Sequence, residues 1–385
     1  MARNEILKKV SGFDEIGRET AILEKYGFDY PSKKGEVKNI LDALHPQRLD
    51  LTVSEITRET ASAKSIRLVS ENGSLPPFQA GQYINVFVEV GGVRISRPYS
   101  IASSPTQTGY YEIAVRRVED GFVSNYLLDD LKPGNQLSSS GPSGNFHYNP
   151  LFHGDQLVFI AGGSGITPFM SMLREAADKN LSRCIHLFYG SRSEDDVIYR
   201  TEIDRIASAH KNITWDLVLS EPAPAFRGLK GFITGSLIKK NLKDLDRTFF
   251  VCGPEAMYQF CLPELEKLSI RSRKIRVEVM GAPKNIVLNP GWPENVKASD
   301  VFKVAIRGKK TISALASEPL MISLERAGIV IPALCRSGEC SLCRTKLLSG
   351  KVYQPHGAKL RKSDQVFGYI HPCMAYPITD IEILL

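Results

Sequence analysis

Four cysteines at a characteristic spacing constrain this chain most strongly. Cys335, Cys340 and Cys343 follow the pattern C-x4-C-x2-C, and Cys373 follows further along the chain. Three thiolates on one tight loop, with a fourth from a later segment, are what a plant-type [2Fe–2S] cluster requires. This group carries one electron at a time, so the pattern predicts a protein that handles electrons.

Zinc and disulfides are the alternatives. Structural zinc sites usually pair two C-x2-C knuckles, and this chain has one such pair. Disulfides need an oxidising compartment, and the N-terminal MARNEILKKV has no apolar run resembling a signal peptide. Gly338 also lets the backbone turn closely around an inorganic core, with loop N–H groups directed at the sulfurs. The sequence therefore favours the cluster, and we expect Cys184 and Cys261 to be buried packing residues.

Length and composition predict a soluble chain of two or three domains. The 385 residues suffice for several cores, and 43% hydrophobic and 24% charged residues are ordinary for a globular protein. No stretch approaches the roughly 18 consecutive apolar residues of a membrane helix. The net charge of +7 does not by itself indicate nucleic acid. We expect a cytoplasmic protein with no nucleic-acid partner and no integral membrane association.

Positive charge is concentrated around the cysteines. From Val301 onward there are 12 Lys/Arg against 6 Asp/Glu, and Arg336, Arg344, Lys346 and Lys351 lie close to the cysteines in sequence. One interpretation is a solvated basic face. The other is electrostatic steering of an acceptor metalloprotein with an acidic docking surface.

Hydrophobic periodicity divides the chain into segments. Residues 1–47 are polar, with helices predicted at Glu15–Tyr26 and Glu36–Leu44 and no chemical motif. Short alternating runs from Leu49 predict a small antiparallel β-barrel over 48–151. Its expected strands are Leu49–Val53, Ser65–Val69, Tyr83–Val90 and Tyr111–Arg117.

Strands and helices alternate over 152–281, which predicts a parallel α/β sheet. Residues 282–300, with the turn-rich Asn289–Pro293, are an expected linker. The final segment, 301–385, alternates short strands with one helix, at about Glu318–Arg326, just before the cysteines.

Arg97–Pro98–Tyr99–Ser100 is expected to end a barrel strand. A flavin phosphate favours an arginine, its ring an aromatic neighbour, and its N5 a hydroxyl partner. A strand-end tyrosine alone is usually a packing residue, but two Gly-containing turns follow. Gly121–Ser124 can begin a helix whose N-terminal amides bind phosphate, and Gly141–Phe146 allows close backbone approach to a ligand.

Ala161–Pro168 (AGGSGITP) forms a strand–turn–helix unit of the kind that cradles a pyrophosphate. It departs from G-x-G-x-x-G and lacks the Lys-Ser/Thr ending of a nucleoside triphosphatase loop. Its glycines alternatively serve only tight strand–helix packing. Cys252–Pro254 is a second turn at the same carboxyl edge of the sheet, where ligands bind in open α/β folds.

With these motifs in this order, the chain resembles the ferredoxin–NAD(P)⁺ reductase superfamily over about residues 48–385. It is similar to the phthalate dioxygenase reductase-like reductase components of Rieske-type oxygenase systems. The resemblance implies a multidomain fold with an antiparallel β-barrel flavin domain, an α/β parallel-sheet nicotinamide nucleotide domain and a β-grasp-like α+β ferredoxin domain. It also implies that Cys335, Cys340, Cys343 and Cys373 ligate the cluster.

The resemblance also implies roles in the flavin and nucleotide sites. Arg97, Tyr99 and Ser100 would hold the flavin phosphate, the ribityl–ring region and N5. Further flavin contacts would be Pro98, Ile113, Ala114, Val115, Gly121 and Ser124. The nucleotide's phosphate turn would comprise Gly162, Gly163, Gly165, Thr167 and Pro168, with Arg192 near the adenosine and Cys252, Gly253 and Pro254 around the nicotinamide. Glu278 matches an acidic residue near the flavin, and the catalytic residues would be Ser100, Cys252 and Glu278.

Two cofactor choices follow from departures within the family. FMN-using phthalate-type members lack a G-P-x-G-x-F turn that several FAD-using members have, so Gly141–Phe146 favours FAD over FMN. The carboxylates at 194–196 would repel a 2′-phosphate, whereas Arg192 and Arg200 would bind one. This balance favours NADH, with NADPH as the alternative.

The implied activity is electron transfer from NAD(P)H through flavin and cluster, one electron at a time, to a separate acceptor. A Rieske-type oxygenase or demethylase is the expected acceptor. Another metalloenzyme, such as a corrinoid or hybrid-cluster protein, is the alternative client. A non-enzymatic redox-sensing subunit is a further alternative, against which the intact Arg97–Ser100 and Cys252–Pro254 motifs argue.

Overall fold

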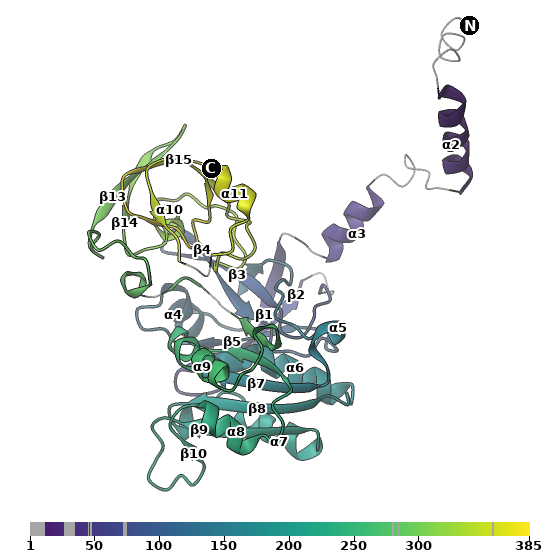
Figure 1. The fold of residues 1–385 in the computed structure, drawn as a ribbon, viewed down its shortest axis with the longest axis vertical. Coiled ribbons are helices and arrows are strands. Elements are labelled where there is room, and N and C mark those ends of the chain that lie inside the picture. Colours follow the sequence, from purple (N-terminus) through teal and green to yellow (C-terminus); the bar gives the residue numbers. More distant parts are fainter. Residues whose placement is uncertain are drawn as a thin grey trace, which may run out of the picture. The chain divides into compact units, whose positions relative to one another are not determined.

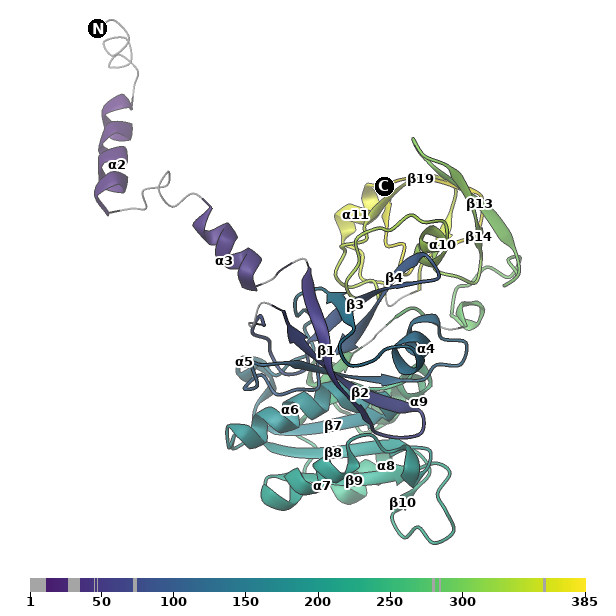
Figure 2. The same cartoon turned by 180° about the vertical axis from the view of Figure 1, so that it is seen from behind.

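The computed structural model describes residues 12–26, 35–44, 46, 48–71, 75–278, 281–283, 285–355 and 358–385. It divides into two compact units, Met1–Gln47 and Arg48–Leu385. The first unit contains helices α2 (Phe13–Tyr26) and α3 (Glu36–Leu44) (Figures 1 and 2). Both were predicted, with α2 starting slightly earlier than expected. The MARNEILKKV segment lies outside the described residues.

The second unit begins with a six-stranded antiparallel barrel in the order β4-β3-β6-β1-β2-β5. An isolated bridge between Ile101 and Ile113 brings its two edge strands together. Leu51, Ile66, Ile84 and other fully buried side chains fill its core. Its elements are β1 (Leu49–Arg58), β2 (Ala63–Ser70), β3 (Tyr83–Val90), β4 (Val93–Ser100), β5 (Tyr111–Arg116), α4 (Phe122–Asp129), β6 (Gln136–Ser139) and α5 (Pro150–His153).

A parallel sheet follows, in the order β10-β9-β8-β7-β11-β12. Its strands are β7 (Gln156–Gly162), β8 (Cys184–Ser191), β9 (Ile213–Leu219), β10 (Leu229–Lys230), β11 (Thr248–Cys252) and β12 (Ile275–Glu278). Helices α6 (Thr167–Asp178) and α7 (Arg200–Ala209) pack on one face, and α8 (Gly235–Asn241) and α9 (Glu255–Lys267) on the other. Strand β7 lies between β8 and β11, so the chain changes direction there, where open α/β sheets bind ligands.

The barrel and the parallel sheet share one hydrophobic core. Ala102 and Ala114 of the barrel belong to the same buried cluster as Phe159 and Phe250 of the sheet. Phe146, from the Gly141–Phe146 turn, packs edge-on against Phe169 and Phe250. This turn therefore fastens the barrel to the sheet.

The C-terminal segment forms a five-stranded mixed sheet in the order β14-β13-β19-β15-β17, beside a two-stranded ladder of β16 and β18. Pro319 precedes α10 in an extended conformation, so this helix starts at Leu320 and not at Glu318. The elements are β13 (Val301–Ile306), β14 (Thr311–Leu315), α10 (Leu320–Arg326), β15 (Thr345–Ser349), β16 (Val352–Tyr353), α11 (Lys362–Val366), β17 (Tyr369–Ile370), β18 (Tyr376–Pro377) and β19 (Ile381–Leu384). Figure 1 shows this segment on the β3–β4 side of the barrel. No helix in the described ranges is long and apolar enough to cross a membrane.

Candidate functional site

A cavity of about 930 Å³ lies where the barrel meets the carboxyl edge of the parallel sheet. The end of β4, the turn after β7 and the turn after β11 all contribute to its wall. The predicted site residues that line it are Pro98, Tyr99, Ser100, Ala114, Ser124, Gly162, Gly163, Gly165, Thr167, Arg192, Cys252, Gly253, Pro254 and Glu278. Segments far apart in the sequence thus meet at one chamber.

Five predicted site residues lie elsewhere. Ile113 and Val115 are fully buried in the barrel core, because successive residues of a strand point to opposite faces and only Ala114 faces the cavity. Pro168 is buried in the first turn of α6, and Gly121 is the N-cap of α4. Arg97 is part-buried outside the cavity lining, within electrostatic range of Arg336.

The glycine-rich turn has two separate constraints. After β7 ends at Gly162, a short 3₁₀ segment (Gly163–Ile166) leads into α6. Gly163 has φ +53°, and a Cβ there would come within 2.7 Å of the Arg116 guanidinium. A Cβ on Gly165 would lie 2.1 Å from the carbonyl oxygen of Cys252. The glycines therefore serve both the wall of the cavity and the close packing of its two turns.

The turn after β11 is held by a tyrosine. The hydroxyl of Tyr258 accepts a hydrogen bond from Gly253 N at 2.9 Å and donates one to the carbonyl oxygen of Glu278. Burial, together with the neighbouring Glu278, raises the pKa of the Cys252 thiol. Cys252 therefore remains an uncharged thiol at neutral pH.

Glu278 is a buried carboxyl group. Its side chain is buried at the edge of the cavity. Burial, with the nearby Glu339 and Cys335, raises its pKa to about 8. Glu278 is therefore predominantly protonated at neutral pH and can donate as well as accept a hydrogen bond.

The cavity also contains residues that sequence reasoning missed. Arg116 forms an ion pair with Asp196, which accepts a hydrogen bond from Ser62 at 3.0 Å and lies 3.8 Å from Arg192. Tyr258 and Phe232 also line the wall. The adjacent Arg116 and Arg117 at the end of a predicted strand were a usable sequence signal. No local sequence pattern marks the other residues of this paragraph as part of the cavity.

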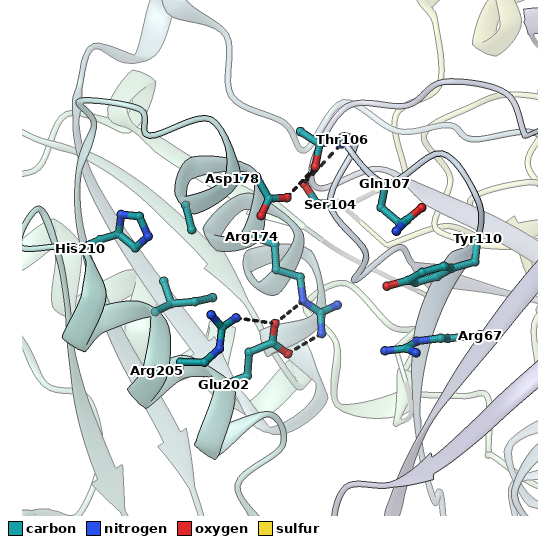
Figure 3. Close-up of a pocket in the computed structure, with 12 residues that line it drawn as sticks. Arg67, Ser104, Thr106, Gln107, Tyr110, Arg174, Asp178, Glu202, Arg205 and His210 are labelled. Atoms are coloured by element: carbon teal, nitrogen blue, oxygen red, sulfur yellow. Dashed lines mark hydrogen bonds and ion pairs between the residues drawn. The ribbon is translucent and has the colours of Figure 1, made fainter.

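A second cavity, of about 520 Å³, lies between the barrel and helices α6 and α7 (Figure 3). Arg174 donates to Glu112 at 2.7 Å and to Glu202 at 2.6 Å, and Arg67 donates to Glu112 at 3.0 Å. Burial alone would raise the pKa of Glu112, but Arg174 and Arg67 lower it. The arginine charges here are matched by carboxylates, so the network joins two domains and is not an open anion site.

The four predicted metal ligands form two pairs. The sulfurs of Cys335 and Cys340 lie 3.4 Å apart, and so do those of Cys343 and Cys373. A tetrahedral ion with bonds of about 2.3 Å places two sulfur ligands roughly 3.7 Å apart. Within the described part of the chain, no three His, Cys, Asp or Glu side chains converge on one ion. Two thiol pairs fit a two-iron group, with each iron held by two cysteines.

The loop backbone is shaped for thiolates. Backbone N–H groups of Ser337, Glu339 and Cys340 donate to the sulfur of Cys335, each at 3.4 Å. Hydrogen bonding with the Cys340 thiol lowers the pKa of Cys335 and outweighs the effect of burial. Gly338 has φ +77°, and a Cβ there would lie 2.9 Å from Met374. The residues present therefore fit a [2Fe–2S] group.

One corner of this site reaches solvent. Cys340 is exposed, whereas Cys335, Cys343 and Cys373 are buried. Leu342 beside it is 48% exposed. Cys340 is therefore the ligand thiol that solvent reaches, and the other three are enclosed by protein.

Several charges counted in the sequence are already neutralised. Arg336 is buried and bound through both guanidinium arms to Glu325 of α10, at 2.6 and 2.8 Å. Arg344 pairs with Asp364 at 2.9 Å, and Lys359 pairs with Glu339. The basic surface near the cysteines is therefore smaller than the sequence count indicates.

Arg97 provides a test of the flavin site. Its guanidinium donates to Ser96 O at 2.8 Å, and among the described residues no carboxylate lies within ion-pair distance. Burial and the nearby Arg336 lower its pKa to about 10. A part-buried cation without a carboxylate fits a phosphate ligand at the end of β4.

Three known domain families match successive parts of the second unit. The oxidoreductase FAD-binding domain family matches residues 50–148, the oxidoreductase NAD-binding domain family residues 159–262, and the 2Fe-2S iron-sulfur cluster binding domain family residues 304–377. The structure of phthalate dioxygenase reductase has the same fold, with a TM-score of 0.63, 24% identity, and coverage of 88% of this chain and 97% of that one.

Two relatives that match over nearly their whole length are named as reductase components of monooxygenases. The glycine betaine monooxygenase reductase subunit of Chromohalobacter salexigens is 26% identical over 86% of this chain and 93% of its own length. The ferredoxin reductase component of 3-ketosteroid-9-alpha-monooxygenase from Mycobacterium tuberculosis is 28% identical over 86% of this chain and 94% of its own.

Proposed function

We propose that this oxidoreductase, with its FAD-binding, NAD-binding and 2Fe-2S domains, is a member of the ferredoxin–NAD(P)⁺ reductase superfamily and the reductase component serving a Rieske-type oxygenase or demethylase. When bound, NAD(P)H supplies a hydride, FAD accepts it, and the iron–sulfur group carries the electrons singly. The relatives named as monooxygenase reductase components support this choice of acceptor. We divide the chain into 1–47, a barrel over 48–151, a nucleotide domain over 152–281, a linker over 282–300 and a ferredoxin domain over 301–385.

The residues act by binding and orientation. Tyr99 and Ser100 would hold the flavin ring edge, and Arg97 its phosphate. The Gly162–Thr167 turn would bind the nucleotide phosphates, and Cys252–Pro254 would seat the nicotinamide. Protonated Glu278 would offer a hydrogen bond from the wall of the cavity. Cys335, Cys340, Cys343 and Cys373 would hold the two irons in the pairs described above.

One observation carries the proposal. The turns after β4, β7 and β11 line one cavity, and the two thiol pairs belong to the same compact unit as that cavity. Replacing Cys340 by Ser removes a ligand on the exposed corner of the cluster. We expect NADH-dependent reduction of cytochrome c to fall by about 100-fold or more, because its electrons pass through the cluster, while ferricyanide reduction persists. Cys184→Ser, on β8, is the matched control and should change neither activity. Equal loss of both activities in Cys340→Ser would contradict the proposed path.

The acceptor would dock at the α11 corner of the ferredoxin domain. Val366 and Phe367 are 80% and 63% exposed, and the exposed bases Arg361 and Lys362 flank them. The Arg344–Asp364 pair ties α11 to the residue after Cys343. An apolar patch with a basic border suits an acceptor whose docking surface is acidic.

Charge reversal tests this docking surface. In Lys362→Glu we expect slower reduction of acidic cytochrome b5 at low ionic strength, with the difference disappearing at high salt because exposed charges are screened. Basic cytochrome c should respond in the opposite direction. Lys309→Glu, in the β13–β14 turn, is the control, and an equal effect there would refute the α11 location.

NADH is the proposed donor. Arg192 lies 3.8 Å from Asp196 and Arg200 lies 3.9 Å from Glu194, so each arginine already has a carboxylate neighbour where a 2′-phosphate would bind. A higher kcat/KM for NADPH than for NADH would overturn this assignment. A cytoplasmic location is also proposed, because none of the seven cysteines forms a disulfide.

A further inference from the structure

Asn85 of β3 joins the barrel to the loop that carries the cysteines. Its Nδ2 donates to the carbonyl oxygen of Ala333 at 2.8 Å and to Ser96 Oγ at 3.0 Å. The side chain is fully buried, and Ala333 lies two residues before Cys335. One amide group thus bonds both the barrel and the cysteine loop.

Asn85 is also next to the flavin motif. In the β3–β4 ladder it pairs with Pro98, and its partner Ser96 directly precedes Arg97, whose guanidinium donates to the Ser96 carbonyl. A short chain of contacts therefore runs from Arg97 through Ser96 and Asn85 to Ala333.

A second residue on the same face of β3 also approaches the cysteine loop. Tyr83 lies two positions before Asn85, so the two side chains share one side of the strand. The pKa of Tyr83 is raised by its burial and by the nearby Cys335 and Cys340. The face of β3 that carries both residues therefore abuts the loop.

The energetics favour a specific role for the amide. Asn85 Oδ1 is buried and has no hydrogen-bond partner among the residues that the structure describes. An unpaired buried oxygen costs about 1–3 kcal/mol, and an apolar side chain of the same shape would avoid this cost. What an apolar side chain cannot supply is the donation to Ala333.

We propose that Asn85 is a positioning residue that fixes the cysteine loop against the flavin-binding strand and so sets the rate of electron passage from barrel to ferredoxin domain. This inference rests on the proposed function, since it concerns the transfer between those two domains. Asn85 acts through the position of the loop and contacts no reacting atom.

Asn85→Leu keeps the approximate shape and removes the donor. Losing one buried hydrogen bond corresponds to a roughly threefold to tenfold change. We expect cytochrome c reduction to fall by about that factor, with ferricyanide reduction within about twofold of wild type. Hydrogen exchange of the peptide spanning 333–343 should be faster, which reports loop anchoring independently of activity. Ser96→Ala, which removes the partner within the barrel, is the control and should leave loop exchange unchanged.

Asn85→Ala gives a second test if the leucine variant fails to fold, because the smaller side chain cannot donate to Ala333 and adds no bulk to the buried site. Unchanged loop exchange and cytochrome c reduction in a folded Asn85 variant would overturn the proposal. So would an equal fall of both acceptor activities, since that indicates a general effect on the barrel. Failure of the proposed function would appear differently: in a chain that keeps Asn85, cytochrome c reduction would survive Cys340→Ser.

Discussion

The barrel meets its two neighbours in different ways. Against the nucleotide domain it shares a hydrophobic core and buried ion pairs, with Glu112 held between Arg67 and Arg174 and Asp196 bound to Arg116. Against the ferredoxin domain it offers the face of β3, where the Asn85 amide bonds Ala333. The first interface contains buried ion pairs, whereas the second includes a neutral hydrogen bond.

The difference corresponds to what each interface must do. Hydride transfer needs reacting atoms about 3–3.5 Å apart, so the two halves of the cavity must be held rigidly. Electron tunnelling weakens with distance but needs no such contact, so a lighter connection suffices. We therefore expect changes at the first interface to impair stability and hydride transfer, and changes at the second to impair only electron exit.

The largest expected effect is at the buried ion pairs. Arg174→Met leaves Glu112 with one of its two arginine partners in a buried position. Breaking a buried pair costs about 3–5 kcal/mol, and we expect a decrease of that order in the free energy of unfolding, measured with denaturant. Both acceptor activities should fall together. Arg205→Ala removes a side chain that is 70% exposed and lies 3.7 Å from Glu202, and should cost less than about 0.5 kcal/mol.

A change in the turns of the cavity should affect hydride transfer with less effect on stability. In Gly165→Ala the new Cβ would lie 2.1 Å from Cys252 O and push the two turns apart. A displacement near 1 Å can cost about 100-fold in rate, so we expect ferricyanide reduction to fall by roughly 10- to 100-fold. Gly109→Ala, in an exposed turn, is the control. Normal flavin reduction in Gly165→Ala would show that the turns tolerate separation.

The smallest effect concerns Glu278, which lies near both interfaces. Because its folded pKa is about 8, above its ordinary value, the folded state retains a proton that the unfolded state loses as pH rises. Stability from this group is therefore present at low pH and declines up to about pH 8. Glu278→Gln should remove that decline, so its Tm relative to wild type should rise between pH 5.5 and 8. An equal pH dependence of Tm in both proteins would show that ionisation of Glu278 does not cause the decline.

Much of the fold was predictable because its signals are local. The ranges Glu36–Leu44 and Tyr83–Val90 agree with the predicted limits, since hydrophobic periodicity and turn residues mark them directly. Strand β6 was missed because its sequence, QLSS, is short and polar. The start of α10 was placed slightly early because Pro319 holds the preceding residue outside the helix.

The sequence motifs that form the site were predictable, but which of their side chains line the cavity was less so. Ile113, Ala114 and Val115 are adjacent in sequence, yet only Ala114 lines the cavity, because the strand directs its neighbours into the core. Arg336 was counted with the basic surface and is buried against Glu325.

The sequence by itself determined the cofactor chemistry and the order of the domains. The cysteine spacing, the flavin motif and the glycine-rich turn are short patterns in which neighbouring residues meet one chemical requirement. Only the tertiary structure decided how the thiols pair, which charges are neutralised, and that Asn85 connects the barrel to Ala333 across a long sequence separation. Those features depend on which distant segments pack together, and a local pattern carries no record of that.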